Sequence, residues 1–302
     1  MPCMNHQPAG SLPVPRVSIG MPVYNGERWL EETLQSLRGQ TLADFELIIS
    51  DNASTDATRA ICERHGAEDR RIRYYRNAHN IGANRNYNAV AALARAKYFK
   101  WTSSHDLCDL RFLECCVAAL EAEPNAVLAY PRTMMFSNSI EDAAPYEEDI
   151  AAMQESAAAR FTHILCNMNL VNPIYGLIRT PLLRRAHPMG VFHSADRIML
   201  AELALLGKFV LIPEPLFFYR MSEESTMHLR PPAEQVRHLE PDATSPPPWQ
   251  NWKFQASLFR DAVVSAPSGA EKVAATVFAL KSIVWGRGNL LRDVKTAMRM
   301  GR

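Results

Sequence analysis

Three groups of polar residues within the first 106 positions of the chain each follow an apolar run. They are Tyr24-Asn25, Asp51-Asn52 and Ser103-Ser104-His105-Asp106. Carboxylates, amides and an imidazole can accept hydrogen bonds from a ligand or hold a cation. In open α/β sheets, ligands bind outside the carboxyl ends of the strands. We therefore expect the three groups to converge on one binding site.

Short apolar runs alternate with helical patterns along this part of the chain. Strands are predicted at Val17–Gly20, Phe45–Ser50, Arg71–Arg76, Tyr98–Trp101 and Ala126–Tyr130. Helices are predicted between them at Glu27–Arg38, Ala57–His65, Tyr87–Ala96 and Leu110–Glu123. Alternating strands and helices are typical of β-α-β units. The fold class is therefore α/β, with a Rossmann-like, mostly parallel sheet flanked by helices.

Several classes of protein are disfavoured by motifs and composition. The first strand is followed neither by G-x-G-x-x-G nor by a P-loop, so the phosphate cradles of those nucleotide-binding folds are missing. The 302 residues include 33 Lys and Arg against 32 Asp and Glu, a net charge of +1 that argues against a broad nucleic-acid-binding face. Six cysteines without a C-x-x-C pair indicate reduced thiols in a cytoplasmic protein rather than a disulfide scaffold.

A series of motifs, in order, resembles a family 2 glycosyltransferase with a GT-A fold. The motifs lie at Val17–Gly26, Glu46–Asp56, Asn80–Asn86, Lys100–Asp109, Ser194–Asp196 and Pro213–Arg220. They extend over about Arg16 to Arg220. The resemblance implies an inverting enzyme that moves a sugar, of hexosyl type, from a nucleotide-sugar donor to an acceptor hydroxyl. Polysaccharide biosynthesis at the cell envelope is the process that the resemblance suggests.

The resemblance also implies which residues bind the donor. They are Pro22, Val23, Tyr24, Asn25, Asp51, Asn52, Gly82, Arg85, Asn86, His105 and Tyr175. Asp51 would accept a hydrogen bond from an imide N–H of the base, which favours a UDP- or dTDP-sugar and leaves GDP open. The alternative is that Asp51 only braces its turn. Arg85 would pair with the diphosphate, or it is an ordinary surface residue.

The expected cation site departs from the family's usual pattern of two or three acidic residues. Here the motif is Ser103-Ser104-His105-Asp106, so His105 replaces one aspartate and the resemblance assigns Asp106 as the ligand of Mg²⁺ or Mn²⁺. One carboxylate is enough for a hard cation that also binds phosphate oxygens and water. His105 either joins the ligands or packs beside them.

Asp196 is the residue that the resemblance implies as the general base. A base must reach the acceptor hydroxyl while the donor's anomeric carbon faces that hydroxyl. The alternative for Asp196 is a carboxylate that only stabilises the start of the predicted helix Arg197–Leu206. A second function therefore stays open, namely a non-catalytic protein of the same fold that binds nucleotide sugars or acts as a scaffold.

The remaining predictions concern domain limits and location. Residues 1–15 are expected to be a disordered leader, 16–229 the GT-A domain, and 230–302 a Pro-rich linker with a helical extension. The acceptor would be a saccharide, a lipid-linked sugar or a small molecule. Basic and apolar residues alternate after Arg287, which predicts contact with the inner face of an anionic membrane, or packing on the core or in a homodimer. No apolar run reaches the ~20 residues of a spanning helix, so a cytoplasmic location is expected.

Overall fold

The computed structural model describes residues 14–221, 232–243 and 249–300. The first part alternates strands with helices: β1 (Val17–Val23), α1 (Glu27–Arg38), β2 (Phe45–Asp51), α2 (Thr58–Glu68), β3 (Ile72–Arg76), α3 (Ala83–Ala92) and β4 (Tyr98–Trp101). The predicted alternation is confirmed. The predicted helix Tyr87–Ala96 is wrong in its bounds, because the turn at Gly82 starts the helix four residues earlier and it ends at Ala92.

The second part is less regular. It continues with β5 (Leu107–Cys108), α4 (Phe112–Ala122), β6 (Ala126–Phe136), the short 3-10 helix η1 (Ile140–Asp142), β7 (Ala144–Pro145), α5 (Ala157–Asn167), the 3-10 helix η2 (Asn172–Tyr175), β8 (Leu177–Arg179), α6 (Thr180–Leu183), α7 (Ala195–Leu206) and β9 (Lys208–Arg220). Strand β6 runs past its predicted end because the sheet accommodates Pro131 at a shift in register against β9.

One sheet organises these elements, in the order β3-β2-β1-β4-β8-β6-β9-β5, with β7 beside β6. Strands β3, β2, β1 and β4 are all parallel, and the long pair β6 and β9 is parallel as well. Strand β8 pairs antiparallel with both β4 and β6 and so joins the two parallel groups. Strand β5 pairs antiparallel with β9 at the edge of the sheet. Every residue of β1 and β2 is buried, as expected for parallel strands covered on both faces.

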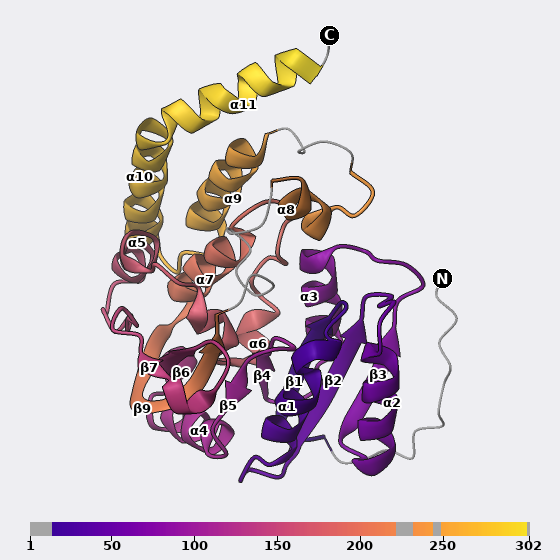
Figure 1. Cartoon of the computed structure of the whole chain (residues 1–302). Coiled ribbons are helices and arrows are strands. Elements are labelled where there is room, and N and C mark those ends of the chain that lie inside the picture. The colour runs from indigo at the N-terminus through magenta and orange to yellow at the C-terminus, as the bar shows by residue number, and fades with distance from the viewer. Residues whose placement is uncertain (1–13, 222–231, 244–248, 301–302) are drawn as a thin grey trace.

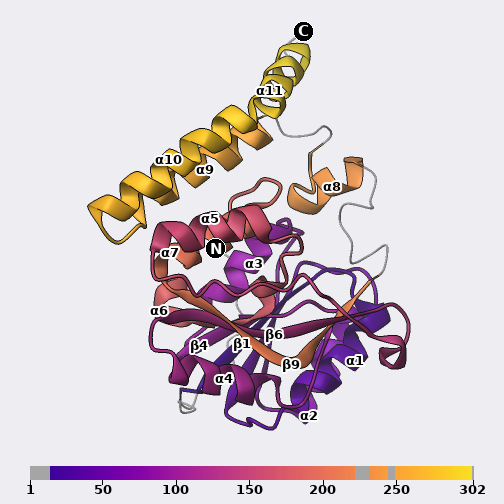
Figure 2. The ribbon, with the colours of Figure 1, turned by 90° about the vertical axis from the view of Figure 1, so that its left-hand side faces the viewer.

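Helices cover both faces of the sheet (Figure 1). Helices α1, α2 and α4 lie on one face, over a core that includes Leu30, Leu34 and Leu37 of α1. Helices α3, α5 and α7 lie on the other face, over a second core centred on Trp101 and Phe161. Figure 2 shows this layering from the side.

The final helices are α8 (Pro232–Leu239), α9 (Gln250–Val264), α10 (Gly269–Trp285) and α11 (Arg287–Met300). The expectation that this Pro-rich segment lacks regular structure is wrong at α8, because a proline at the first helical position needs no N–H partner. Pro246-Pro247-Pro248 lie outside the described residues. Helices α9 and α10 form an outer layer on α5 and α7, and α11 extends away from the sheet (Figure 2).

The outer layer shares a hydrophobic core with the rest of the chain. Leu258 and Ala262 of α9, with Ala275 and Ala279 of α10, are buried in the same cluster as the residues beneath α5 and α7. No helix among the described residues combines the length and the apolarity needed to cross a bilayer.

Candidate donor and acceptor site

The carboxyl ends of β1, β2 and β4 bring the predicted polar groups to one edge of the sheet. Val23 lies in register with Asp51, and Gly20 with Trp101, so the segments that follow leave the sheet side by side. A Cβ on Gly26 would lie 3.1 Å from the Ser104 hydroxyl, which shows how closely the first and third segments approach.

The turn after β1 is tied to the turn after β2. Asn25 adopts a left-handed backbone (φ 51°), its side-chain oxygen accepts from Thr55 N at 2.8 Å, and its own N–H donates to Ser54 Oγ at 2.9 Å. Pro22 and Val23 are buried at the end of β1. The Tyr24 side chain is 50% exposed, so its ring is available to a ligand at this edge.

Asp51 is fully buried at the end of β2. Its Oδ1 accepts from Ser54 N at 2.8 Å, and its Oδ2 accepts from the Tyr74 hydroxyl at 2.6 Å and from Arg76 Nη1. Burial and the neighbouring Asp51 carboxylate raise the pKa of Tyr74. The structure therefore shows that Asp51 stabilises its turn. Its contact with the nucleobase of the donor stays a prediction.

Asn52 and Asn86 belong to a buried network of amides. Asn52 donates to Asn80 Oδ1 at 2.6 Å and accepts from Asn77 Nδ2 and Ile81 N. Asn86 exchanges hydrogen bonds with Ser50, at 2.6 and 2.8 Å. Asn52 fixes the segment before α3, and Asn86 fixes α3 itself, against the end of β2. Both side chains therefore stabilise the backbone around the site.

Gly82 and Arg85 lie at the start of α3, under the segment that follows α8. Gly82 has φ +84°, and a Cβ there would lie 2.1 Å from the carbonyl oxygen of Leu239. Arg85 Nη2 lies 3.6 Å from Glu240 Oε1, and Nη1 donates to Ile81 O. Arg85 therefore pairs with a carboxylate of this chain, and its predicted pairing with a diphosphate is untested.

The loop after β4 holds Asp106 firmly. The Ser103 hydroxyl donates to Asp106 Oδ2 at 2.6 Å, and Arg220 N donates to Oδ1 at 2.8 Å. The Asp106 side chain is 1% exposed, whereas that of His105 is 24% exposed and its Nε2 lies 3.9 Å from Asp106 Oδ1. The imidazole therefore faces outward while the carboxylate supports the loop.

Arg220, at the end of β9, holds this loop from behind. Its buried guanidinium donates through Nε to the carbonyl oxygen of His105 and through Nη2 to Glu32, both at 2.8 Å. It stacks over the rings of Trp29 and Phe136, 3.9 and 4.4 Å from their centroids. The sequence motif included Arg220 but did not indicate this function.

Tyr175 lies beside the same loop. Its hydroxyl is 3.3 Å from that of Tyr87, and its carbonyl oxygen accepts from the buried Lys100 ammonium at 2.7 Å. Burial raises the pKa of Tyr175 well above its usual value, and the charge of Asp106 contributes to this rise. The pair of hydroxyls forms part of the floor next to Asp106.

Asp196 lies in the first turn of α7, as predicted. Its Oδ1 accepts from Arg197 N at 2.8 Å, while the Arg197 guanidinium turns away to the carbonyl oxygens of Met168 and Asn169. Among the described residues its carboxylate has no other hydrogen bond. Burial raises the pKa of Asp196, which favours a carboxylate that can take up a proton.

The charges of the Asp106 and Asp196 carboxylates both act on Tyr87. Burial raises the pKa of Tyr87 to about 12, and the charges of both Asp106 and Asp196 add to that rise. Electrostatic effects of this kind fade with distance. The charges of the loop after β4 and of the start of α7 therefore both act on Tyr87.

Asp106 and His105 fit a divalent cation. Each oxygen of Asp106 accepts one hydrogen bond from the chain, which leaves it a further lone pair. The separation of 3.9 Å between His105 Nε2 and Asp106 Oδ1 allows both to lie near one ion, since ligands lie about 2.1 Å from such a cation.

Arg76 and Tyr74 are site residues that sequence reasoning missed. A usable signal did exist, because β3 is parallel to β2 and its last residue, Arg76, is in register with Asp51. Charged residues that end adjacent parallel strands face the same crevice.

The sequence matches the description "Glycosyl transferase family 2" over residues 18–176. An uncharacterized glycosyltransferase of Haemophilus influenzae is 30% identical over 107 residues, which are 35% of this chain and 33% of that protein. The chondroitin synthase of Escherichia coli is 30% identical over 39% of this chain and 17% of its own length. The chain thus spans about a third or less of these relatives.

Solved structures share the fold. S. aureus TarS 1-349 in complex with UDP-GlcNAc has a TM-score of 0.63 at 17% identity, covering 88% of this chain and 71% of that one. The mannosyltransferase PcManGT of Pyrobaculum calidifontis, in complex with GDP-Man and Mn²⁺, has a TM-score of 0.53 at 15% identity, covering 95% and 81%. The predicted GT-A fold is confirmed, and since the match spans more than half of its residues, the chain belongs to glycosyl transferase family 2.

Proposed function

We propose that this chain transfers a sugar from a nucleoside diphosphate to an acceptor hydroxyl with inversion, and that Asp196 is its general base. Asp196 carries the proposal. It is the carboxylate at the start of α7, and its charge, like that of Asp106, acts on Tyr87. Its single hydrogen bond and its burial leave it basic and available, whereas Asp106 is held by the chain.

The reaction is a single displacement. The acceptor oxygen attacks the anomeric carbon as the Asp196 carboxylate takes the hydroxyl proton. The bond from that carbon to the diphosphate oxygen breaks, and its electron pair leaves with the nucleoside diphosphate. Attack opposite to the leaving group inverts the anomeric centre.

Charge on the departing diphosphate needs neutralisation. Asp106 and His105 would hold Mg²⁺ or Mn²⁺, and such a cation supplies Lewis-acid stabilisation of the leaving phosphate oxygens. The chain's own contribution is to fix the Asp106 carboxylate through Ser103 and the backbone of His105 through Arg220. Arg85 would assist only after release from Glu240.

The base of the donor would lie at the ends of β1 and β2. The half-exposed Tyr24 ring offers a stacking surface, and Asp51 with Arg76 offers an acceptor beside a donor. This combination suits the edge of uracil or thymine, which presents an imide N–H between two carbonyls. UDP- and dTDP-sugars are therefore the favoured donors, with a GDP-sugar as the alternative.

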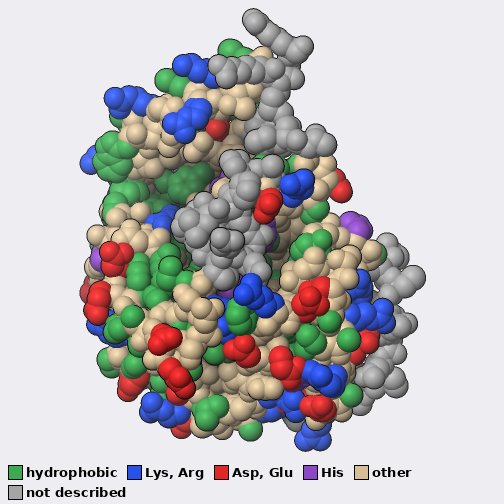
Figure 3. All heavy atoms as spheres, viewed as in Figure 1, with side chains coloured by type: hydrophobic (Ala, Val, Ile, Leu, Met, Phe, Trp, Pro, Cys, Tyr) green, Lys and Arg blue, Asp and Glu red, His purple; other side chains and the backbone are tan. Residues whose placement is uncertain are grey.

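An acceptor anchored in a membrane would suit the outer helices. Val273, Val277, Leu280 and Val284 recur at helical spacing along α10, and each is at least 45% exposed. Basic side chains gather over α11, the helix that follows α10 (Figure 3). Apolar and basic residues side by side favour the surface of an anionic bilayer. A lipid-linked acceptor, with the enzyme bound to the inner face of the membrane, is thus proposed over a homodimer.

The test begins with donor binding. The thermal unfolding temperature is measured with UDP, dTDP and GDP, each with and without Mn²⁺, because a ligand of the folded state raises it by mass action. The corresponding nucleotide sugars are then assayed for transfer and hydrolysis, with chelator as the control. Absence of any stabilisation or turnover across the panel would contradict the proposal.

A second function rests on the changed cation motif. Ser104 and His105 stand where the family usually has acidic residues, and both oxygens of Asp106 already accept hydrogen bonds. A protein that binds a nucleotide sugar without turnover is therefore the alternative. Stabilisation by a donor, with no transfer to any acceptor offered, would favour it.

A further inference from the structure

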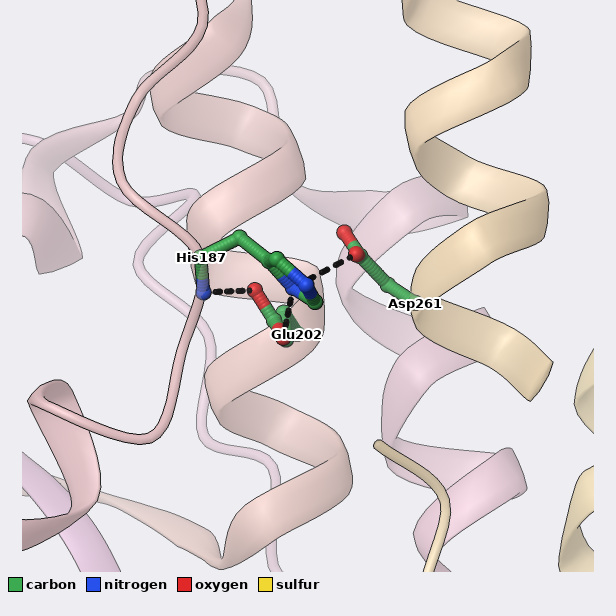
Figure 4. A group of neighbouring side chains, drawn as sticks. All are labelled: His187, Glu202 and Asp261. Atoms are coloured by element: carbon green, nitrogen blue, oxygen red, sulfur yellow. Dashed lines mark hydrogen bonds and ion pairs between the residues drawn. The ribbon is translucent and has the colours of Figure 1, made fainter. Parts of the chain in front are cut away.

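Three ionisable side chains meet between α7 and α9, in a cluster separate from the donor edge (Figure 4). His187 lies in the loop before α7, Glu202 on α7 and Asp261 on α9. The Nδ1 atom of His187 is 2.7 Å from Glu202 Oε1 and 3.2 Å from Asp261 Oδ1. The backbone N–H of His187 donates to Glu202 Oε2 at 2.8 Å, so the loop is fixed at the cluster.

The two carboxylates are buried, and one oxygen has no partner. Glu202 is 1% and Asp261 0% exposed. Asp261 Oδ1 accepts from Arg260 Nε at 2.8 Å, but Oδ2 has no hydrogen-bond partner among the described residues. A buried carboxylate oxygen without a donor is costly, and such atoms commonly mark a missing proton, water or ion.

Two further side chains contact the carboxylates of the cluster. Arg260 Nη2 lies 2.7 Å from Asp261 Oδ1, and Ser265 Oγ donates to Glu202 Oε1 at 2.6 Å. Neither of them reaches Asp261 Oδ2, which stays without a partner among the described residues.

A small pocket leads to the cluster. Its lining includes His187, Glu202 and Arg260, together with the apolar side chains of Phe192 and Ile198. The pocket thus gives access to His187 and Glu202, and Asp261 lies behind this lining.

We propose that His187, Glu202 and Asp261 form a binding site for a divalent transition metal ion of the Zn²⁺ class. Each residue offers one ligand atom, and these atoms lie within 4.8 Å of one another. Ligand atoms about 2.0–2.1 Å from a tetrahedral zinc ion lie about 3.3 Å from one another. The 3.2 Å between Nδ1 and Asp261 Oδ1 fits this spacing, and the 2.7 Å between Nδ1 and Glu202 Oε1 would lengthen when an ion replaces the hydrogen bond. One imidazole with two carboxylates is a nitrogen and oxygen ligand set suited to this class.

Binding requires the neutral imidazole, so the ion replaces the proton on His187 Nδ1. Ser265, bonded to Glu202, and Arg260, bonded to Asp261, orient the two carboxylates from the next layer. A bound ion would join α9 of the outer layer to α7, the helix whose first turn carries Asp196. The site does not depend on the proposed transfer reaction.

The test uses the full chain, stripped with EDTA and titrated with ZnCl₂ in a calorimeter. The background is His105→Ala, because this change weakens the candidate cation site at the donor edge. On it, Asp261→Asn and His187→Gln are compared with His163→Gln, a matched change on α5 outside the cluster. Co²⁺ spectra and unfolding temperatures are recorded for each variant. Asp261→Asn is expected to fold, because it removes a buried charge.

The background and His163→Gln are expected to bind one equivalent of Zn²⁺ per chain, with a rise in unfolding temperature. Asp261→Asn and His187→Gln should each lose about 100-fold or more in affinity, beyond the tenfold to hundredfold seen for outer-layer residues. The Co²⁺ form should show visible d–d bands that Asp261→Asn and His187→Gln abolish. The proposal would be overturned if the His105→Ala background did not bind Zn²⁺, or if all four proteins bound Zn²⁺ with equal affinity. The three side chains would then form only a hydrogen-bonded cluster.

Discussion

Replacing Asp196 by asparagine should separate catalysis from folding. Asparagine has the same shape and keeps an oxygen that can accept from Arg197 N, but it cannot take a proton. Loss of a general base costs typically 10²- to 10⁴-fold in rate. At about 1.36 kcal/mol per tenfold, the barrier should rise by roughly 3 to 5 kcal/mol. The affinity for the donor should stay within about twofold, because donor contacts are proposed elsewhere.

The effect on stability should have the opposite sign. A carboxylate in the first turn of a helix gains about 0.3–1 kcal/mol from the helix dipole. The pKa of Asp196 is nevertheless raised by burial, so desolvation outweighs that gain in the folded state. A raised folded pKa makes the contribution of Asp196 to stability fall as pH increases from the unfolded to the folded pKa. Asp196→Asn should therefore be at least as stable as the parent at neutral pH.

The measurement combines steady-state transfer, donor titration and urea unfolding at pH 7.5. Asp142→Asn, an exposed carboxylate on η1, is the matched control and should leave all three unchanged. A rate for Asp196→Asn above a tenth of the parental value would refute its function as the base. A clear loss of stability would instead indicate that Asp196 acts as a helix cap.

Three further substitutions test the residues that we expect to hold the site in place or to bind its cation. Arg220→Met removes the hydrogen bonds of the guanidinium to His105 O, Ser137 O and Glu32, so urea unfolding should show a loss of about 3 kcal/mol. Gly82→Ala places a Cβ 2.1 Å from Leu239 O at φ 84° and ψ 156°, a backbone region that is essentially restricted to glycine; the backbone alone costs about 1–3 kcal/mol, and limited proteolysis should show release of the α8 segment. His105→Ala should raise the Mn²⁺ concentration for half-maximal activity about tenfold, and an unchanged value would place His105 outside the cation site.

Much of the fold could be predicted because local patterns and tertiary demands agree. Helix α1 has the predicted bounds, since Leu30, Leu34 and Leu37 form one apolar face that the core buries. Strand β4 also has its predicted bounds, because Tyr98–Trp101 is buried on both sides. Helix α3 was displaced by four residues, since its start depends on the positive φ of Gly82 and on the amide contact of Asn52, which follows β2, with Ile81.

The site was predictable in its location but not in its contacts. The sheet edge followed from strand order, whereas the bonds from Tyr74 and Arg76 to Asp51 depend on which strand lies next to β2. The hydrogen bond from Arg220 to the carbonyl oxygen of His105 joins residues more than 100 positions apart. Such partners are determined by the topology of the folded chain, so the spacing of residue types along the sequence does not predict them.

The outer layer of α9 and α10 has a consequence for folding during synthesis. These helices leave the ribosome after α5 and α7, whose apolar faces they cover. Since chains fold from the N-terminus as they emerge, a growing chain exposes that surface until the residues from the end of α7 at Leu206 to the end of α10 at Trp285 have been translated, some seconds at about 5–20 residues per second. This interval is when a chaperone would be most useful to the nascent protein.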